Sequence, residues 1–260
     1  MERIGKSWHP PESERMTPRH SDAARSVATT LNVEVDVSHD RWRDQLHDAR
    51  ADAARLAELF EFGIPSDGLQ LAGSAVLATA PSTDLTAVIG DLQAELRRRG
   101  WIGDTELAVA LIEHAEQRAS ELIPIALDLG DLAEVIDQST SSESYIDLEA
   151  GVVCPGELLD LDQGPDDFDP DDAGRWLLVS GEGSTSAYGD MERFVATVES
   201  EALRNRLQQA ISGKAPFKAF LATLQRDDDQ FTSWHRHRDD ARLGRARHWL
   251  AEHGYTPTRI

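Results

Sequence analysis

The chain has 260 residues and is strongly acidic, with 47 Asp and Glu against 26 Lys and Arg and a formal net charge of −21. Such a charge disfavours non-specific binding to phosphate backbones and to anionic membranes. The single cysteine, Cys154, excludes an internal disulfide. No apolar run approaches the ~20 residues of a membrane helix, and the first residues lack the apolar stretch of a signal peptide. We therefore expect a cytoplasmic protein without membrane association.

The N-terminal part begins with a polar, proline-containing stretch, residues 1–29, which predicts a flexible tail. Residues 31–37, "LNVEVDV", alternate between apolar and polar positions and predict a short strand. From Asp40 to Phe60 the apolar residues recur at three and four positions, which predicts one amphipathic helix that ends before Gly63. Residues 68–81 are small and apolar without a period, so a strand pair and a packed loop both remain open.

Two further helices are expected before residue 122. Ser82 is a suitable N-cap for the first, and the run Arg97 to Arg99 suits the negative end of its dipole. Asp104 or Thr105 is expected to start the second. Residues 30–122 thus form a mostly α-helical region.

A long segment without any basic residue follows. Residues 119–174 hold 16 Asp and Glu and no Lys, Arg or His. Within it, residues 128–137 predict a short helix and residues 144–154 a hairpin, followed by an acidic loop and an apolar strand at 175–180. These patterns predict three short antiparallel strands.

After residue 184 the apolar spacing is helical almost to the end. Successive stripes at 188–198, 203–211 and 217–224 precede a last helix that ends at Gly254. The expected fold is therefore α+β: a small antiparallel sheet packed with helices in residues 123–260, preceded by the mostly α-helical region.

Several separated blocks resemble a known family. They are "YIDLEAGVV", "RWLLV", "SAYGDMERFVATV", "AISGKAPFKAFLATL" and "RDDARLGRARHWLAEHGY". Over residues 123–256 the chain resembles uncharacterised protein family 0158, a bacterial group, and "ELRRRGWIGDTELA" is similar to the N-terminal extension of its actinobacterial members. The family is named for lacking a known activity, so the resemblance implies no catalytic residue and no cofactor.

Motifs for catalysis, cofactors or metals are weak. The loop at Gly181 and Gly183 lacks the third glycine of a dinucleotide fingerprint, so a helix start is the preferred interpretation. The acidic loop does not match the spacing of a calcium loop, and the histidines do not match that of a zinc site. We expect no cofactor, no metal and no catalytic site, although a site assembled from dispersed residues remains open.

The last helix concentrates positive charge in an acidic chain. Residues 231–260 hold six Arg against three acids. We predict that Arg238 and Arg242 pair with carboxylates of the same chain, the natural candidates being Asp147, Glu149 and Asp190. The composition favours a non-enzymatic interaction or regulatory protein whose acidic surface binds a basic protein partner.

The alternative function is nucleic-acid binding by this arginine-rich helix. Trp234 and Trp249 would then serve as its aromatic anchors. The net charge of −21 disfavours this alternative.

Overall fold

The computed structural model describes residues 41–61, 63–138, 143–161, 163–181 and 184–258. The predicted tail and the predicted strand at 31–37 lie outside these ranges. Residues 43–260 form one compact unit.

The N-terminal region is helical, as predicted. Its elements are α2 (Arg41–Ala49), α3 (Ala53–Phe60), α4 (Leu69–Leu77), the 3-10 turn η1 (Thr83–Leu85), α5 (Thr86–Arg99) and α6 (Asp104–Ala115). The prediction of one helix from Asp40 to Phe60 is wrong. The chain turns at Ala51, whose φ is +66°, and the carboxylate of Asp52 accepts hydrogen bonds from the backbone of Ala54 and Arg55. A new helix begins at this cap.

Residues 69–77 form helix α4, rather than the strand pair or the packed loop considered for residues 68–81. It lies against α6, α12 and α5, and seven of its nine residues are buried. A helix that is covered on nearly every side needs no polar face, so its sequence shows no amphipathic period.

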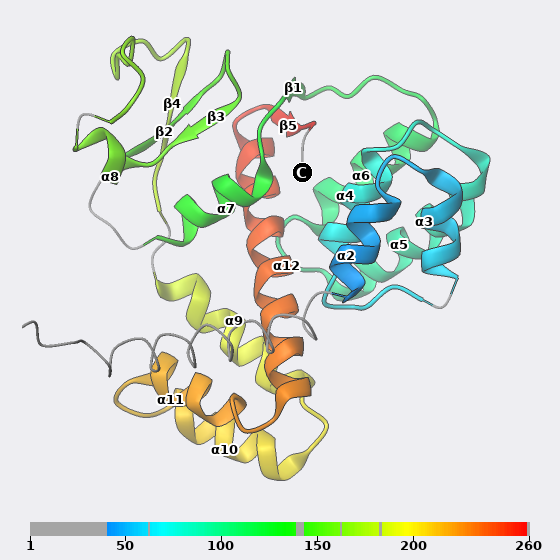
Figure 1. Cartoon of the computed structure of the whole chain (residues 1–260), viewed down its shortest axis with the longest axis vertical. Helices are drawn as coiled ribbons and strands as arrows, with labels where there is room; N and C mark the ends of the chain where they lie inside the picture. Colours follow the sequence, from blue (N-terminus) through cyan, green and yellow to red (C-terminus); the bar gives the residue numbers. More distant parts are fainter. Residues whose placement is uncertain (1–40, 62, 139–142, 162, 182–183, 259–260) are drawn as a thin grey trace, which may run out of the picture. The chain divides into compact units, whose positions relative to one another are not determined.

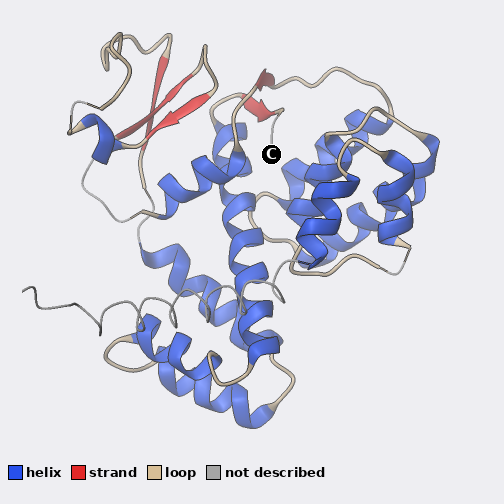
Figure 2. Cartoon of the chain, viewed as in Figure 1, coloured by secondary structure: helices blue, strands red, loops and turns tan. Residues whose placement is uncertain are grey.

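The predicted sheet is confirmed. Strand β2 (Ser144–Asp147) is central and pairs antiparallel with β3 (Val152–Cys154) and with β4 (Trp176–Val179). Helix α7 (Leu129–Asp137) precedes the sheet, and the short α8 (Gly156–Leu159) follows β3. A second sheet was not predicted: β1 (Ile123–Ile125) and β5 (Tyr255–Pro257) pair in parallel (Figure 2). Two three-residue strands far apart in the sequence give no alternating pattern to detect.

The C-terminal helices are α9 (Ser184–Thr197), α10 (Glu201–Ile211), α11 (Pro216–Leu224) and α12 (Asp228–Glu252). Helix α12 contacts α7, α4, α9, α6, α11 and β5 (Figure 1). Its first half joins the apolar core of α9 to α11 through Trp234, and its second half joins the core of α7 and the sheet through Leu243 and Leu250. The expected α+β fold is confirmed.

No helix in the described ranges combines the length and the apolar character required to cross a membrane.

Candidate functional site

Arg238 and Arg242 both contact carboxylates of their own chain. Arg242 Nε lies 2.9 Å from an oxygen of Asp137, and Arg238 Nη2 lies 3.0 Å from an oxygen of Asp239. These partners differ from the three that we predicted. The physical reason is the packing of α7 directly on α12, which places Asp137, the last residue of α7, beside Arg242.

Asp190 binds another arginine of the same helix. Arg245 Nη1 donates to both carboxylate oxygens of Asp190 at 3.0 Å, while its Nη2 donates to Asp137 at 2.6 Å. Arg193 also contacts Asp190. Asp190 is fully buried, and burial raises the pKa of its carboxyl against the opposing charges of Arg245 and Arg193. This ionic centre connects α12 to α9 and α7.

A second buried ionic centre surrounds Arg99. Its guanidinium donates to Asp104 through Nε and Nη2, at 3.0 and 2.6 Å, and to Asp240 through Nη1. Asp240 also accepts from the backbone N–H of Gln70 at 2.7 Å. Burial raises the pKa of Asp240 to about 6, although Arg99 opposes the shift. Arg99 was interpreted as a residue that suits the helix dipole, whereas its buried side chain links α5 to α6 and α12.

His237 packs beside both ionic centres. Its ring is 2% exposed and contacts the rings of Trp101, Phe194 and Trp234. Burial lowers the pKa of His237 to about 3, and the nearby positive charges of Arg193 and Arg99 act in the same direction. The imidazole is therefore neutral at physiological pH and has the character of a core side chain.

We expect this histidine to make folding sensitive to acid. Below its ordinary pKa of 6.5 the unfolded chain protonates His237 while the folded chain does not, so stability falls as the pH falls. The limiting slope is ~1.4 kcal/mol per pH unit. Asp240 acts in the opposite direction below pH 6, because its carboxyl is protonated more readily in the folded state.

A His237→Gln variant separates the contribution of His237 to the pH dependence of stability from that of Asp240. Between pH 7 and 5 the wild type is expected to lose ~2 kcal/mol more of its unfolding free energy than the variant loses. Urea unfolding monitored by tryptophan fluorescence at each pH provides the measurement. Parallel pH dependences of the two proteins would contradict the assignment of a neutral, buried imidazole.

Asp147 and Glu149 lie in the hairpin rather than at the last helix. Asp147 accepts from the backbone N–H groups of Glu149 and Ala150 and pairs with Arg175 at 2.8 Å. The hydrogen bonds from Arg175 lower the pKa of Asp147. Glu149 is exposed, and its carboxylate lies 3.8 Å from Arg175. Asp147 thus shapes the turn between β2 and β3.

The sheet has one face on the core and one covered by the acidic loop. Ile146, Val153 and Leu177 pack toward α7 and α12. On the opposite face Tyr145 and Trp176 contact Phe168 of the loop, with both pairs of ring centroids 5.0 Å apart. Cys154 is buried beside these rings, and burial raises the pKa of its thiol, which disfavours the reactive thiolate.

We call this outer side of the sheet, with residues 157–172, the acidic face. Its described carboxylates at Glu157, Asp160, Asp166, Asp167, Asp169, Asp171 and Asp172 are exposed. Four exposed apolar side chains lie among them or project from the same side of the sheet: Val152, Leu158, Leu161 and Leu178. Apolar side chains that gather on a surface rimmed by charged residues can contribute to a protein-binding site.

The two tryptophans of the last helix, Trp234 and Trp249, differ in how deeply they are buried. Trp234 is 5% exposed and contacts the rings of Phe194 and Phe220. Trp249 is half-buried against the core of α7 and stacks on His253 at 3.9 Å. Trp234 is therefore inaccessible as an aromatic anchor in this structure, because its ring fills the core between α9 and α11.

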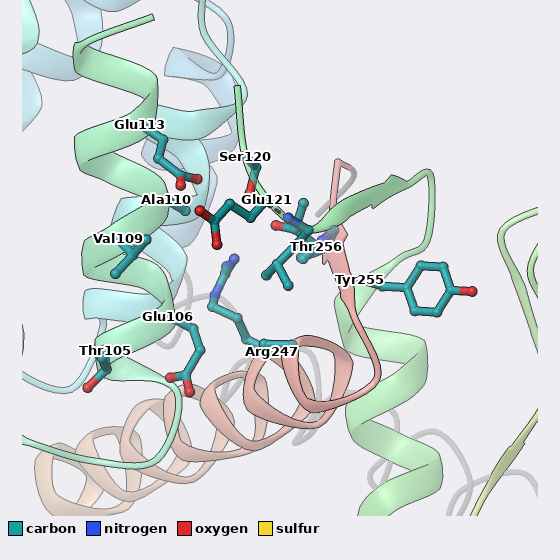
Figure 3. A pocket seen from close by; sticks show the side chains of 13 residues that line it. Thr105, Glu106, Val109, Ala110, Glu113, Ser120, Glu121, Arg247, Tyr255 and Thr256 are labelled. Carbon is teal, nitrogen blue, oxygen red and sulfur yellow. Dashed lines mark hydrogen bonds between the residues drawn. The ribbon is translucent and has the colours of Figure 1, made fainter. Parts of the chain in front are cut away.

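A pocket of about 220 Å³ lies between α6, residues 120–122 and the end of the chain. Arg247 reaches into it, and Glu106, Glu113 and Glu121 line it (Figure 3). Arg247 is 3% exposed, and burial lowers the pKa of its guanidinium to about 10, so it remains charged at neutral pH. A buried cation in a pocket with three carboxylates can recognise charged groups of a small ligand.

Sequence reasoning did not identify Asp240, Arg99 or Arg247 as buried polar residues. For Asp240 and Arg247 the available signal was the last helix itself, which carries charged residues on all sides over 25 residues. A helix with that pattern either lies in solvent or has its charges paired by neighbours on several sides. Within the described part of the chain, no group of three or more His, Cys, Asp or Glu side chains is arranged to hold a metal ion.

Comparison with known proteins agrees with the resemblance seen in the sequence. The model of the uncharacterised protein family UPF0158 matches residues 122–258, just over half of the chain. A UPF0158 protein of Pseudomonas aeruginosa is 28% identical over 134 residues, which cover 52% of this chain and 87% of that protein. No solved structure matches the chain. The chain therefore belongs to the uncharacterised protein family UPF0158.

Proposed function

We propose that this protein is a non-enzymatic interaction protein whose acidic face binds a basic, amphipathic segment of a protein partner. The observation that supports the proposal is that the exposed leucines Leu158 and Leu161 occur among the exposed carboxylates of residues 157–172, while Leu178 is exposed on the outer side of the sheet. Carboxylates would steer a basic partner toward the surface, and Leu158, Leu161 and Leu178 would contact its apolar side chains.

The arginines of α12 give less support to nucleic-acid binding. Arg236 pairs with Asp67, while Arg238, Arg242 and Arg245 pair with the carboxylates described above. Arg247 donates to Gln70 and Ser74. Guanidinium groups that already neutralise carboxylates of the same chain are less available to phosphates.

A synthetic helical peptide with Lys on one side and Leu on the other tests the proposed function. We expect it to bind the full chain at low salt and to dissociate as salt screens the charges, while the same peptide with Glu in place of Lys does not bind. Fluorescence anisotropy of a labelled peptide measures both affinities.

Two triple variants identify the surface. The first variant carries the amide substitutions E157Q, D166N and D171N, which neutralise three carboxylates of the acidic face. We expect these substitutions to weaken binding at least about tenfold. The matched control removes three exposed carboxylates elsewhere, through D91N, E192Q and E199Q. Equal loss of affinity in the two variants would show that total charge rather than the acidic face governs binding, and would contradict the proposal.

A further inference from the structure

The buried guanidinium of Arg247 has neutral partners. Its Nε donates to Gln70 Oε1 at 3.0 Å, and its Nη2 donates to Ser74 Oγ at 2.6 Å. Among the residues that the structure describes, no carboxylate lies within 4.0 Å of this guanidinium, unlike those of Arg99 and Arg245. The charges of Glu106 and Asp240 act on this guanidinium only from a greater distance, and burial still lowers its pKa. An anionic group delivered from the pocket would offset the remaining cost of burying the charge.

The pocket also presents carboxylates. Glu113 from α6 and Glu121 from the segment before β1 turn toward the space above the Arg247 guanidinium (Figure 3). Glu106 lies lower and contacts His248 Nδ1 at 2.6 Å. A simple anion would be repelled by these three carboxylates, and a simple cation would lie against a buried positive charge.

We propose that the pocket binds a small zwitterion, a free amino acid or a similar amino carboxylate. Its carboxylate would accept a hydrogen bond from Arg247 at the bottom, and its ammonium group would lie between Glu113 and Glu121. Both charges of the ligand then meet opposite charges of the protein, which neither a pure acid nor a pure amine achieves. This site is separate from the acidic face, so it does not depend on the function proposed above.

The size and the walls of the pocket agree with such a ligand. Its volume of about 220 Å³ is below the ~300–1,000 Å³ of typical drug-sized sites, which suits a molecule of amino-acid size. Apolar side chains complete the walls and would contact the ligand's carbon atoms: Val109, Ala110, Leu122, Ala251 and Pro257.

To test the proposal, each standard amino acid is added singly to the full chain, and its binding is measured by thermal unfolding and by isothermal titration calorimetry. A ligand that binds only the folded state raises the melting temperature, and the rise grows with the logarithm of the ligand concentration above its Kd. We expect at least one amino acid to bind saturably, and its deaminated acid and its decarboxylated amine to bind at least about tenfold more weakly. Failure of every amino acid to bind, or equal binding of the acid or the amine, would overturn the proposal.

Variants locate the binding site. The double variant E113Q and E121Q leaves the bonds of Arg247 to Gln70 and Ser74 in place and is expected to weaken binding roughly tenfold to a hundredfold. The control E116Q and E192Q removes two exposed carboxylates outside the pocket and should bind as the wild type does. Wild-type affinity in the pocket variant would refute the site, even if Arg247→Gln itself failed to fold.

Discussion

An Asp190→Ala variant is expected to lose ~3–5 kcal/mol of unfolding free energy, the loss typical of breaking a buried ion pair from one side. Asp190 is fully buried and accepts two hydrogen bonds from Arg245, which is itself 3% exposed. Removal of the carboxylate takes two hydrogen bonds from a buried guanidinium, which keeps its contact with Asp137. Urea unfolding followed by tryptophan fluorescence measures the loss.

The exposed pair of Arg98 and Glu95 on α5 supplies the control. Glu95→Ala removes an ion pair with a contact of 2.5 Å, yet both side chains face solvent, so the urea midpoint should hardly change. A second control replaces the buried pair as a whole, by Asp190→Leu with Arg245→Met, and should recover part of the lost stability. If Asp190→Ala unfolded at the same urea concentration as Glu95→Ala, the buried ionic centre would have no energetic role.

Local signals explain which elements were predictable from the sequence. Ser82 caps the 3-10 turn η1, which leads directly into α5, and Asp128 caps α7; both side chains accept hydrogen bonds from the backbone that follows. The hairpin of β2 and β3 was recognisable because alternation and a turn at Gly151 occur within eleven residues. Each of these signals is contained in a short window, so it survives without knowledge of the tertiary structure.

The partners of the arginines could not be predicted in the same way. Segregation of charge along the sequence suggested pairing of Arg238 and Arg242 with the acidic segment, whereas Arg242 contacts Asp137 of that segment and Arg238 contacts Asp239 of its own helix. It did not distinguish Asp137 from Asp147, because both lie in the same acidic segment and only the packing of α7 on α12 selects between them. The ligand pocket was missed for a related reason: Glu113, Glu121 and Arg247 come together only through tertiary contacts.

A Gly244→Ala variant is expected to destabilise the protein by about 3 kcal/mol or more, because the added methyl group has no room. Gly244 lies inside α12, and a Cβ there would meet the backbone oxygen of Ile102 well inside the 3.0 Å that real Cβ atoms keep. The facing Gly103 has a φ of +85°, and a Cβ on it would in turn meet the backbone of Gly244. Because both obstacles are backbone atoms, no side chain can rotate away to relieve the overlap.

Gly90→Ala in α5 is the matched control for this substitution. Gly90 is exposed, and a Cβ added there has no atom within 4 Å, so the higher helix propensity of Ala should stabilise the chain by ~0.5–1 kcal/mol. Chemical denaturation of the two variants therefore measures the same Gly-to-Ala substitution at two positions where opposite changes in stability are expected. Stabilisation by Gly244→Ala would mean that the start of α6 does not lie against α12. The contact of Asp104 with Arg99 would then be lost as well, since Asp104 directly follows Gly103.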